Sequence, residues 1–156
     1  MINIKDKSIY FLLASILSLV SAYFIEYILN HKPCVLCVYQ RIPYMSIIAF
    51  FFISHKINLS NKLTYSIYLV IFTASCLLAT YHWGVENQIF EGLEACSGKV
   101  NDKIENLQQM KDVIFNSKPS CHHADFTIFS ISLAGWNAIL SFGLAYMSYG
   151  ELKRKI

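Results

Sequence analysis

The chain has 156 residues, of which 55% are hydrophobic and only 15% are charged. A soluble domain usually carries about 25% charged residues, so this composition and a mean hydropathy of +0.43 argue against a water-soluble globule. Few glycines and prolines exclude a collagen-like chain, and the high apolar content excludes disorder. The net charge of +3, without a basic stripe, does not predict nucleic-acid binding.

Four apolar segments follow one another along the chain, and each is long enough to cross a lipid bilayer. A helix that crosses the hydrocarbon core, about 30 Å thick, needs about 20 residues. Backbone groups in lipid must bond within their own segment, so we expect helices. The expected spans are about 8–29, 36–55, 63–83 and 126–149. The sequence therefore predicts that residues 1–156 form a single all-α membrane domain, a four-helix transmembrane bundle.

The basic residues near the ends of the spans predict the orientation, because cytoplasmic loops carry an excess of lysine and arginine. Seven of them gather on one face: Lys5, Lys7, Lys56, Lys62, Lys153, Arg154 and Lys155. In the long loop on the other face, four lysines are outnumbered by seven acidic residues. Both termini are therefore expected in the cytoplasm, and loops of about 30–35 and 84–125 outside. The first span continues past a small-residue segment typical of signal-peptide cleavage, so we interpret it as an uncleaved anchor.

A Cys-X-X-Cys motif, Cys34 to Cys37, stands where the second span begins. Two cysteines at this spacing form an exchangeable disulfide, and a helix start favours a thiolate at Cys37. Arg41 follows one turn deeper on the same helix face. A guanidinium is costly at this depth, so we expect an anionic or strongly accepting partner for it. The alternative is a structural disulfide, with Arg41 extending to lipid headgroups.

Three further features mark the other spans. Pro43 lacks an N–H group and should kink or delay the second helix. His82 ends the third span between Tyr81 and Trp83, where an imidazole could hydrogen-bond a bound ring and relay a proton, or simply belong to an aromatic belt. Cys76, in the middle of that span, is expected to pack. Small residues at four-residue spacing in the fourth span predict close helix packing.

Cys96 and Cys121 form a second pair in the long outer loop, with 24 residues between them. Outer compartments are oxidising, so cysteines there form disulfides. Two disulfides on one face can pass electrons by thiolate exchange, whereas a single staple would only stabilise the loop. Apolar residues between the pair recur at helical spacing and predict a short amphipathic helix on the membrane surface: Val100, Ile104, Leu107 and Ile114.

Two other classes of function remain open at this point. The first is a membrane protein that binds or delivers a soft metal ion through cysteine and histidine. Its candidate ligands are Cys34, Cys37, Cys121, His122 and His123. Cys-His-His in tandem is poor geometry for one tetrahedral centre, and the cysteines would have to be reduced. The second is a structural membrane module that its disulfides only stabilise.

The sequence resembles the DsbB-like disulfide-bond formation proteins of bacteria over essentially the whole chain. The matching segments are 32–41 (KPCVLCVYQR), Tyr81-His82, Gly84-Val85-Glu86 and 132–137 (SLAGWN), together with Cys96 and Cys121. The resemblance implies a thiol:quinone oxidoreductase of the inner membrane that reoxidises a soluble thioredoxin-like oxidase of the DsbA type. The redox cysteines would then face the periplasm.

The resemblance also implies a route for the electrons. The partner's thiolate would attack Cys96 of a Cys96–Cys121 disulfide. The resulting loop dithiol would reduce the Cys34–Cys37 disulfide, and Cys37 would pass electrons to ubiquinone or menaquinone. Arg41 would hold or polarise the quinone, and His82 would assist. A guanidinium below Cys37 suits this role, because it stabilises negative charge that develops on a quinone.

Overall fold

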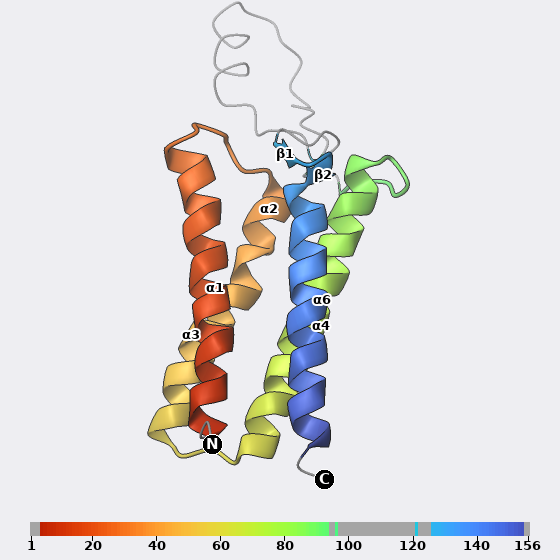
Figure 1. Cartoon of the computed structure of the whole chain (residues 1–156). Coiled ribbons are helices and arrows are strands. Elements are labelled where there is room, and N and C mark those ends of the chain that lie inside the picture. The colour runs from red at the N-terminus through yellow and green to blue at the C-terminus, as the bar shows by residue number, and fades with distance from the viewer. Residues whose placement is uncertain (1–3, 94–95, 97–120, 122–125, 155–156) are drawn as a thin grey trace, which may run out of the picture.

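A computed structural model describes residues 4–93, 96, 121 and 126–154. Within this part of the chain the fold is mostly helical (Figure 1). The helices are α1 (Ile4–Tyr27), α2 (Val35–Tyr39), α3 (Arg41–Lys56), α4 (Asn61–Glu86) and α6 (Leu133–Lys153). Two short strands, β1 (Thr127–Ile128) and β2 (Ile131–Ser132), pair as an antiparallel hairpin before α6. The expected amphipathic helix between the loop cysteines falls outside the described residues.

Three segments of the described chain are long and apolar enough to cross a membrane: Lys7–Tyr27, Val35–Lys56 and Asn61–Glu86. Helix α6 has 21 residues, but Trp136, Asn137 and three glycines make its hydropathy lower than that of these three. Val70 and Leu77 lie on an outward face of α4 and remain 67% exposed. Apolar faces of this size are stable against lipid rather than water. The fold is therefore that of a helical membrane protein.

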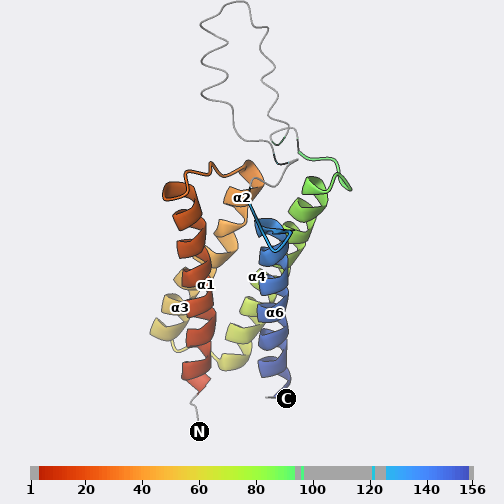
Figure 2. The ribbon, with the colours of Figure 1, turned by 45° about the horizontal axis from the view of Figure 1, so that its top comes forward.

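The long helices run side by side, so the bundle has two distinct ends (Figures 1 and 2). The start of α1 and the end of α6 share one end, where Lys7 Nζ lies 2.8 Å from Glu151 Oε1. Helix α2 and the β1–β2 hairpin lie at the opposite end (Figure 1). Helix α6 packs along α4, and α1 packs against α3. The Cys-X-X-Cys motif, which begins α2, thus lies at the end away from Lys7 and Glu151.

Aromatic side chains fill the core between α1, α3 and α4. Phe11 and Tyr68, with ring centroids 5.3 Å apart, are among the largest fully buried side chains. Tyr44 and Phe72 contact each other edge-on at 6.4 Å. Such ring pairs add to the free energy gained from burial alone. A second buried cluster, at the α2 end, consists of Cys34, Leu36, Val85, Cys96 and Cys121.

The second span is divided at Gln40, as the sequence predicts from Pro43. A proline at this position cannot bond the carbonyl of Tyr39 and clashes with it. Helix α2 accordingly ends at Tyr39, and α3 begins at Arg41. The predicted break is confirmed, and it gives the motif a short helix of its own.

The helix observed in the fourth apolar segment begins later than the expected span of 126–149. Ser132 caps α6, because its Oγ accepts a backbone N–H of the first turn at 3.2 Å. The preceding residues form the hairpin, whose turn residues Phe129 and Ser130 have φ angles of 52° and 63°. The hairpin is as apolar as the helix that follows it, so hydropathy alone does not separate the two.

Helix α6 turns small residues toward the bundle, and at Gly135 the neighbouring side chains leave no room for a Cβ atom. A Cβ atom at Gly135 would lie 2.7 Å from Ile131 Cγ2 and 3.4 Å from Trp83 Nε1. In the same helix, Ala134, Ser141 and Ser148 are buried at seven-residue spacing. The predicted role of small residues in packing this helix is confirmed.

Candidate redox site

The Cys-X-X-Cys motif occupies the first turn of α2. Cys34 is the N-cap residue, and its Sγ accepts a hydrogen bond from the backbone N–H of Cys37 at 3.2 Å. This conformation brings the two sulfur atoms to 2.8 Å. Both residues are thiols in this structure. The helix start therefore holds the two thiols next to each other, in the arrangement that the spacing predicts.

The two loop cysteines lie together and against this motif. The backbone N–H of Cys121 donates to the carbonyl of Cys96 at 3.1 Å. The side chains of Cys96 and Cys121 are 0% and 1% exposed, and they share a buried cluster with Cys34. Burial raises the pKa of Cys96 to about 12 and raises that of Cys121 as well. When reduced, both residues are thus held as thiols at neutral pH.

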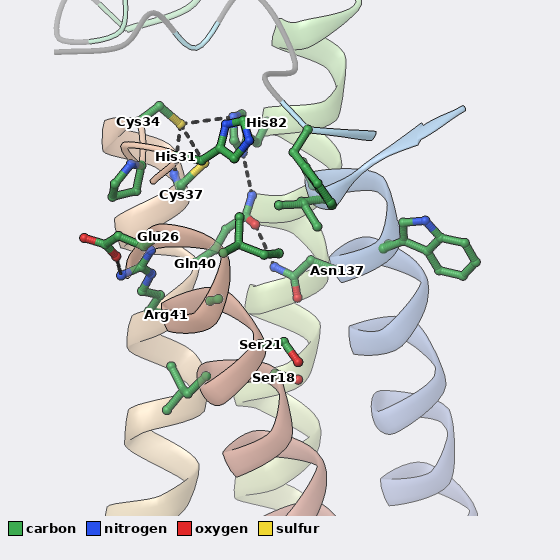
Figure 3. A pocket seen from close by; sticks show the side chains of 18 of the residues that line it. Ser18, Ser21, Glu26, His31, Cys34, Cys37, Gln40, Arg41, His82 and Asn137 are labelled. Atoms are coloured by element: carbon green, nitrogen blue, oxygen red, sulfur yellow. Dashed lines mark hydrogen bonds and ion pairs between the residues drawn. The ribbon is translucent and has the colours of Figure 1, made fainter. Parts of the chain in front are cut away.

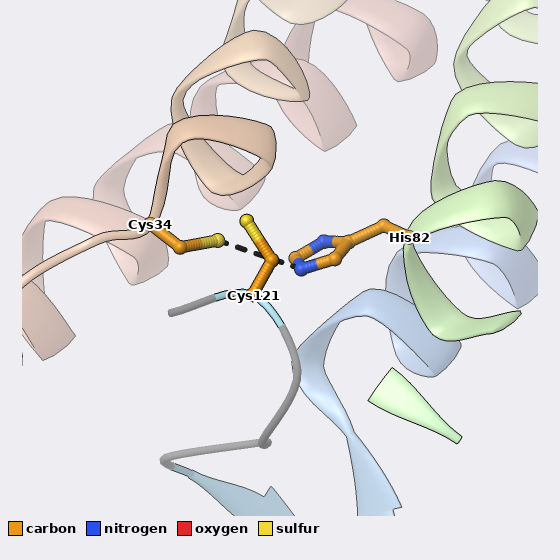
Figure 4. A group of neighbouring side chains, drawn as sticks. All are labelled: Cys34, His82 and Cys121. Carbon is orange, nitrogen blue, oxygen red and sulfur yellow. Dashed lines mark hydrogen bonds between the residues drawn. The ribbon is translucent and has the colours of Figure 1, made fainter. Parts of the chain in front are cut away.

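Cys121 brings the loop pair into contact with the motif. The Sγ atoms of Cys34 and Cys121 and a ring nitrogen of His82 all lie within 4.8 Å of one another (Figure 4). His82 Nε2 is 3.4 Å from Cys34 Sγ. The hydrogen bond with Cys37, followed by burial, raises the pKa of Cys34 to about 12, against a smaller opposing effect of His82. One sulfur of each cysteine pair therefore lies close to a sulfur of the other pair.

A chain of hydrogen bonds leads from His82 into the space between the helices (Figure 3). Gln40 Nε2 donates to His82 Nδ1 at 2.8 Å, and Asn137 Nδ2 donates to Gln40 Oε1 at 2.8 Å. The hydroxyl of Tyr44 donates to Asn137 Oδ1. Because Nδ1 accepts a hydrogen bond, the ring proton of a neutral His82 resides on Nε2. That proton faces Cys34.

Glu86 lies on the other side of His82, one turn along α4. Its Oε1 is 3.6 Å from His82 Nε2, and its side chain is only 9% exposed. Its Oε2 is buried and has no hydrogen-bond partner among the described residues. A carboxylate in this position can attract a cation.

Arg41 has the anionic partner that its depth in the span predicts. Its Nη1 is 2.5 Å from Oε2 of Glu26, near the end of α1. The guanidinium also lies over the ring of Tyr23, 4.7 Å from the centroid. The two charged side chains are 13% and 22% exposed. The ion pair and the ring contact offset the cost of removing the guanidinium from water.

A cavity of about 420 Å³ connects Arg41 to the cysteines (Figure 3). Apolar residues of α1 and α6 form much of its wall, among them Leu17, Ala22, Ile25 and Leu140. The polar groups that reach it include Glu26, Cys34, Cys37, Arg41, His82 and Glu86. An apolar space with a few convergent polar groups is typical of a site for a small organic molecule.

The structure thus gathers the residues singled out in the sequence, with exceptions. Cys34, Cys37, Arg41 and His82 line one cavity. His122 and His123 lie outside the described residues. Cys76 packs against α6, with its Sγ 3.6 Å from the carbonyl of Ala138.

Sequence reasoning does not find the roles of Glu26, Gln40 and Asn137. One signal could have found all three, since a polar side chain inside an apolar span is costly unless it faces the bundle interior. Glu26, Gln40 and Asn137 satisfy that rule, and all three line the cavity.

Helices apolar enough for a membrane and two cysteine pairs in one buried cluster define a class of protein, one equipped to form disulfide bonds. The chain matches the family model of "Disulfide bond formation protein DsbB" over residues 7–149. It is 35% identical over 133 residues to the uncharacterized protein RP370 of Rickettsia prowazekii (strain Madrid E), covering 81% of this chain and 75% of the relative. It is 23% identical over 159 residues to Disulfide bond formation protein B 2 of Pseudomonas fluorescens (strain Pf0-1), covering 97% of this chain and 86% of that relative. The chain belongs to the DsbB family of membrane disulfide-bond formation proteins.

Proposed function

We propose that this protein is a thiol:quinone oxidoreductase that reoxidises a thioredoxin-like dithiol oxidase of the DsbA type. The observation that carries the proposal is the position of Cys121, whose Sγ lies within 4.8 Å of Cys34 Sγ. Cys34 Sγ is in turn 2.8 Å from Cys37 Sγ, beside the cavity. In the overall reaction, one partner dithiol and one quinone become one partner disulfide and one quinol. Two electrons and two protons are transferred.

The contact between Cys121 and Cys34 supports a specific order of exchange. A partner thiolate attacks Cys96 of the loop disulfide, so a mixed disulfide forms and Cys121 leaves as a thiolate. Cys121 attacks Cys34, the Cys34–Cys37 bond breaks, and Cys37 leaves as a thiolate. The partner's second thiolate then resolves the mixed disulfide and releases Cys96. Cys96 attacks Cys121, which restores the loop disulfide and releases Cys34.

His82 has a distinct role in this scheme. Its Nε2–H, 3.4 Å from Cys34 Sγ, donates to that sulfur and stabilises the thiolate as Cys34 leaves. Gln40 positions the imidazole for this task through its hydrogen bond to Nδ1.

The cavity beside Cys37 has the chemistry that a quinone needs. Its apolar walls suit a flat ring with an isoprenoid tail, and the Arg41 guanidinium suits a ring oxygen. When bound, the quinone supplies the acceptor for two electrons from the Cys34–Cys37 dithiol. Arg41 favours that transfer, because its charge stabilises negative charge on the ring oxygen. Ubiquinone and menaquinone both carry such oxygens.

We further propose that α6 is the fourth membrane span. A helix of 21 residues rises about 32 Å, and the hydrocarbon core is about 30 Å thick. Phe142 and Tyr146 on its outward face are 66% and 70% exposed. The basic residues at the Lys7 end then orient that end to the cytoplasm. The cysteine cluster would face the periplasm of a bacterial inner membrane.

A quinone-reduction assay on detergent-purified protein tests this function, with a reduced thioredoxin-like oxidase as the electron donor. We expect donor-dependent reduction that is lost in Cys37→Ser and kept in Cys76→Ser. Arg41→Met should raise the KM for quinone about 10-fold or more, while Arg154→Met should not, since that side chain is 72% exposed at the far end of α6. No reduction with either quinone, while the Cys34–Cys37 bond stays intact, would favour the structural module instead.

A further inference from the structure

Three buried side chains at the redox site carry donor atoms for a thiophilic metal ion (Figure 4). Cys34, His82 and Cys121 are 6%, 2% and 1% exposed, and their ligand atoms lie within 4.8 Å of one another. Zn–S bonds of about 2.3 Å and Zn–N bonds of about 2.0 Å place tetrahedral ligand atoms roughly 3.5–3.8 Å apart. The Cys34–His82 pair, at 3.4 Å, is already close to that separation. A small movement of the Cys121 sulfur toward the other two ligand atoms would complete a set of three ligands.

Glu86 supplies an independent observation at the same place. One oxygen of its carboxylate is 3.6 Å from His82 Nε2, and the side chain is 9% exposed. The other oxygen is buried and has no hydrogen-bond partner within the described part of the chain. A buried, unpaired carboxylate oxygen is costly. A cation held by the three ligands would pair with the negative charge of Glu86. The Glu86 carboxylate could also coordinate the cation as its fourth ligand.

The hydrogen-bond chain behind His82 can support coordination through Nε2. Coordination requires the ring proton on Nδ1, which must then donate to an acceptor. Gln40 provides its amide oxygen if the amide turns over, and Asn137 can turn in the same way. Tyr44 would then accept from Asn137 and donate to Ser141 Oγ, 3.0 Å away. Each member of this chain can both donate and accept, so the whole chain can reverse without losing a bond.

We propose that the reduced protein binds one thiophilic divalent cation of the Zn²⁺ class through Cys34, Cys121 and His82. Each thiol loses one proton on binding, and nothing is oxidised or reduced. The bound ion holds the two sulfurs that meet in disulfide exchange, so exchange stops until the ion leaves. This arrest, unlike binding itself, rests on the proposed function. Formation of the two disulfides would conversely remove the ligands and release the ion.

A titration of fully reduced, detergent-purified protein with Cd²⁺ under anaerobic conditions tests the site. We expect one ion per chain, with the ultraviolet charge-transfer band of Cd–thiolate bonds and release of two protons. Cys34→Ser or Cys121→Ser should weaken binding about 100-fold or more, and His82→Ala about 10- to 100-fold. Cys96→Ser and Cys76→Ser should bind like the wild type, because neither sulfur belongs to the trio. Zn²⁺ should displace Cd²⁺.

Two outcomes would overturn the site. Binding that survives in Cys121→Ser but is lost in Cys37→Ser would mean chelation by the Cys-X-X-Cys motif alone. The absence of stoichiometric binding would leave no site at all. Alkylation of the wild-type protein gives a second measurement that does not depend on the folding of any variant. Bound Cd²⁺ should protect Cys34 and Cys121 from alkylation but should not protect Cys76. The titration uses neither quinone nor partner, so its result is separable from failure of the oxidoreductase function.

Discussion

Arg41 and Glu26 form an ion pair between α3 and α1, with Arg41 Nη1 2.5 Å from Glu26 Oε2. Both side chains line the same cavity. Because they are mostly buried, removing one partner leaves an uncompensated charge. We expect Glu26→Gln and Arg41→Met each to lower the free energy of unfolding by about 1–2 kcal/mol. The double variant should lose about 1 kcal/mol less than the sum.

Denaturant unfolding in detergent measures this cycle. The control pair is Lys7→Met and Glu26→Gln, whose effects should add, because Lys7 instead pairs with Glu151 at the other end of the bundle. Additive effects of Arg41→Met and Glu26→Gln would show that the ion pair does not couple α1 to α3.

Helix α6 has one glycine at which a side chain would clash and two at which it would not. A Cβ at Gly135 would lie 2.7 Å from Ile131 Cγ2, whereas a Cβ at Gly143 would meet nothing within 4 Å. We expect Gly135→Ala to destabilise by about 1–3 kcal/mol and Gly143→Ala to be neutral or stabilising by up to about 1 kcal/mol. Thermal unfolding of the two variants checks this, and equal melting temperatures would argue against close packing at Gly135.

His82 is expected to act on Cys34 rather than only to line the bundle. His82→Ala should slow turnover about 10- to 100-fold. The slow step should be the departure of Cys34, so the Cys34–Cys121 disulfide should accumulate. Rapid acid quench and non-reducing mass spectrometry measure that species. His55→Ala is the matched control, because His55 is exposed and stacks on Phe51. A His82→Ala variant with wild-type turnover would reduce His82 to a packing role.

The ion pair at the other end of the bundle predicts a pH dependence of stability. Glu151 lies beyond the expected span, and the hydrogen bond from Lys7 lowers its pKa below the ordinary value of 4.5. The pair therefore stabilises the fold above pH 4.5 and loses its effect as the pH falls through the lowered pKa. Glu151→Gln should cost up to about 1 kcal/mol at pH 7 and nothing at low pH. Melting temperatures across pH 3 to 7 test this, and a pH-independent difference would contradict it.

The spacing of nearby residues was enough to predict much of the molecule. Cys34 and Cys37 share one turn, and the effect of Pro43 on the helix is also local. The need of Arg41 for an anionic partner followed from its depth alone. The identity of that partner did not, because Glu26 reaches Arg41 only once α1 and α3 have packed together.

Other features depend on contacts between distant segments and could not be predicted. Gln40 and Asn137 are 97 residues apart in sequence and form one hydrogen bond in the hydrogen-bond chain. Which loop cysteine lies beside Cys34 likewise depends on contacts between residues far apart in the sequence. The hairpin before α6 escaped detection for a different reason, because its residues are as apolar as a membrane span. The roles of the site residues stay predictions that the experiments above address.

We propose above that electrons pass from the loop pair to the motif through Cys121 and Cys34. Two double variants test it most directly: Cys37→Ser with Cys96→Ser, and Cys34→Ser with Cys96→Ser. Each leaves one motif cysteine and Cys121, and mild oxidation followed by non-reducing mass spectrometry measures how fast they join. The account predicts a Cys34–Cys121 disulfide about tenfold faster than a Cys37–Cys121 disulfide. Equal rates, or a faster Cys37–Cys121 bond, would contradict it.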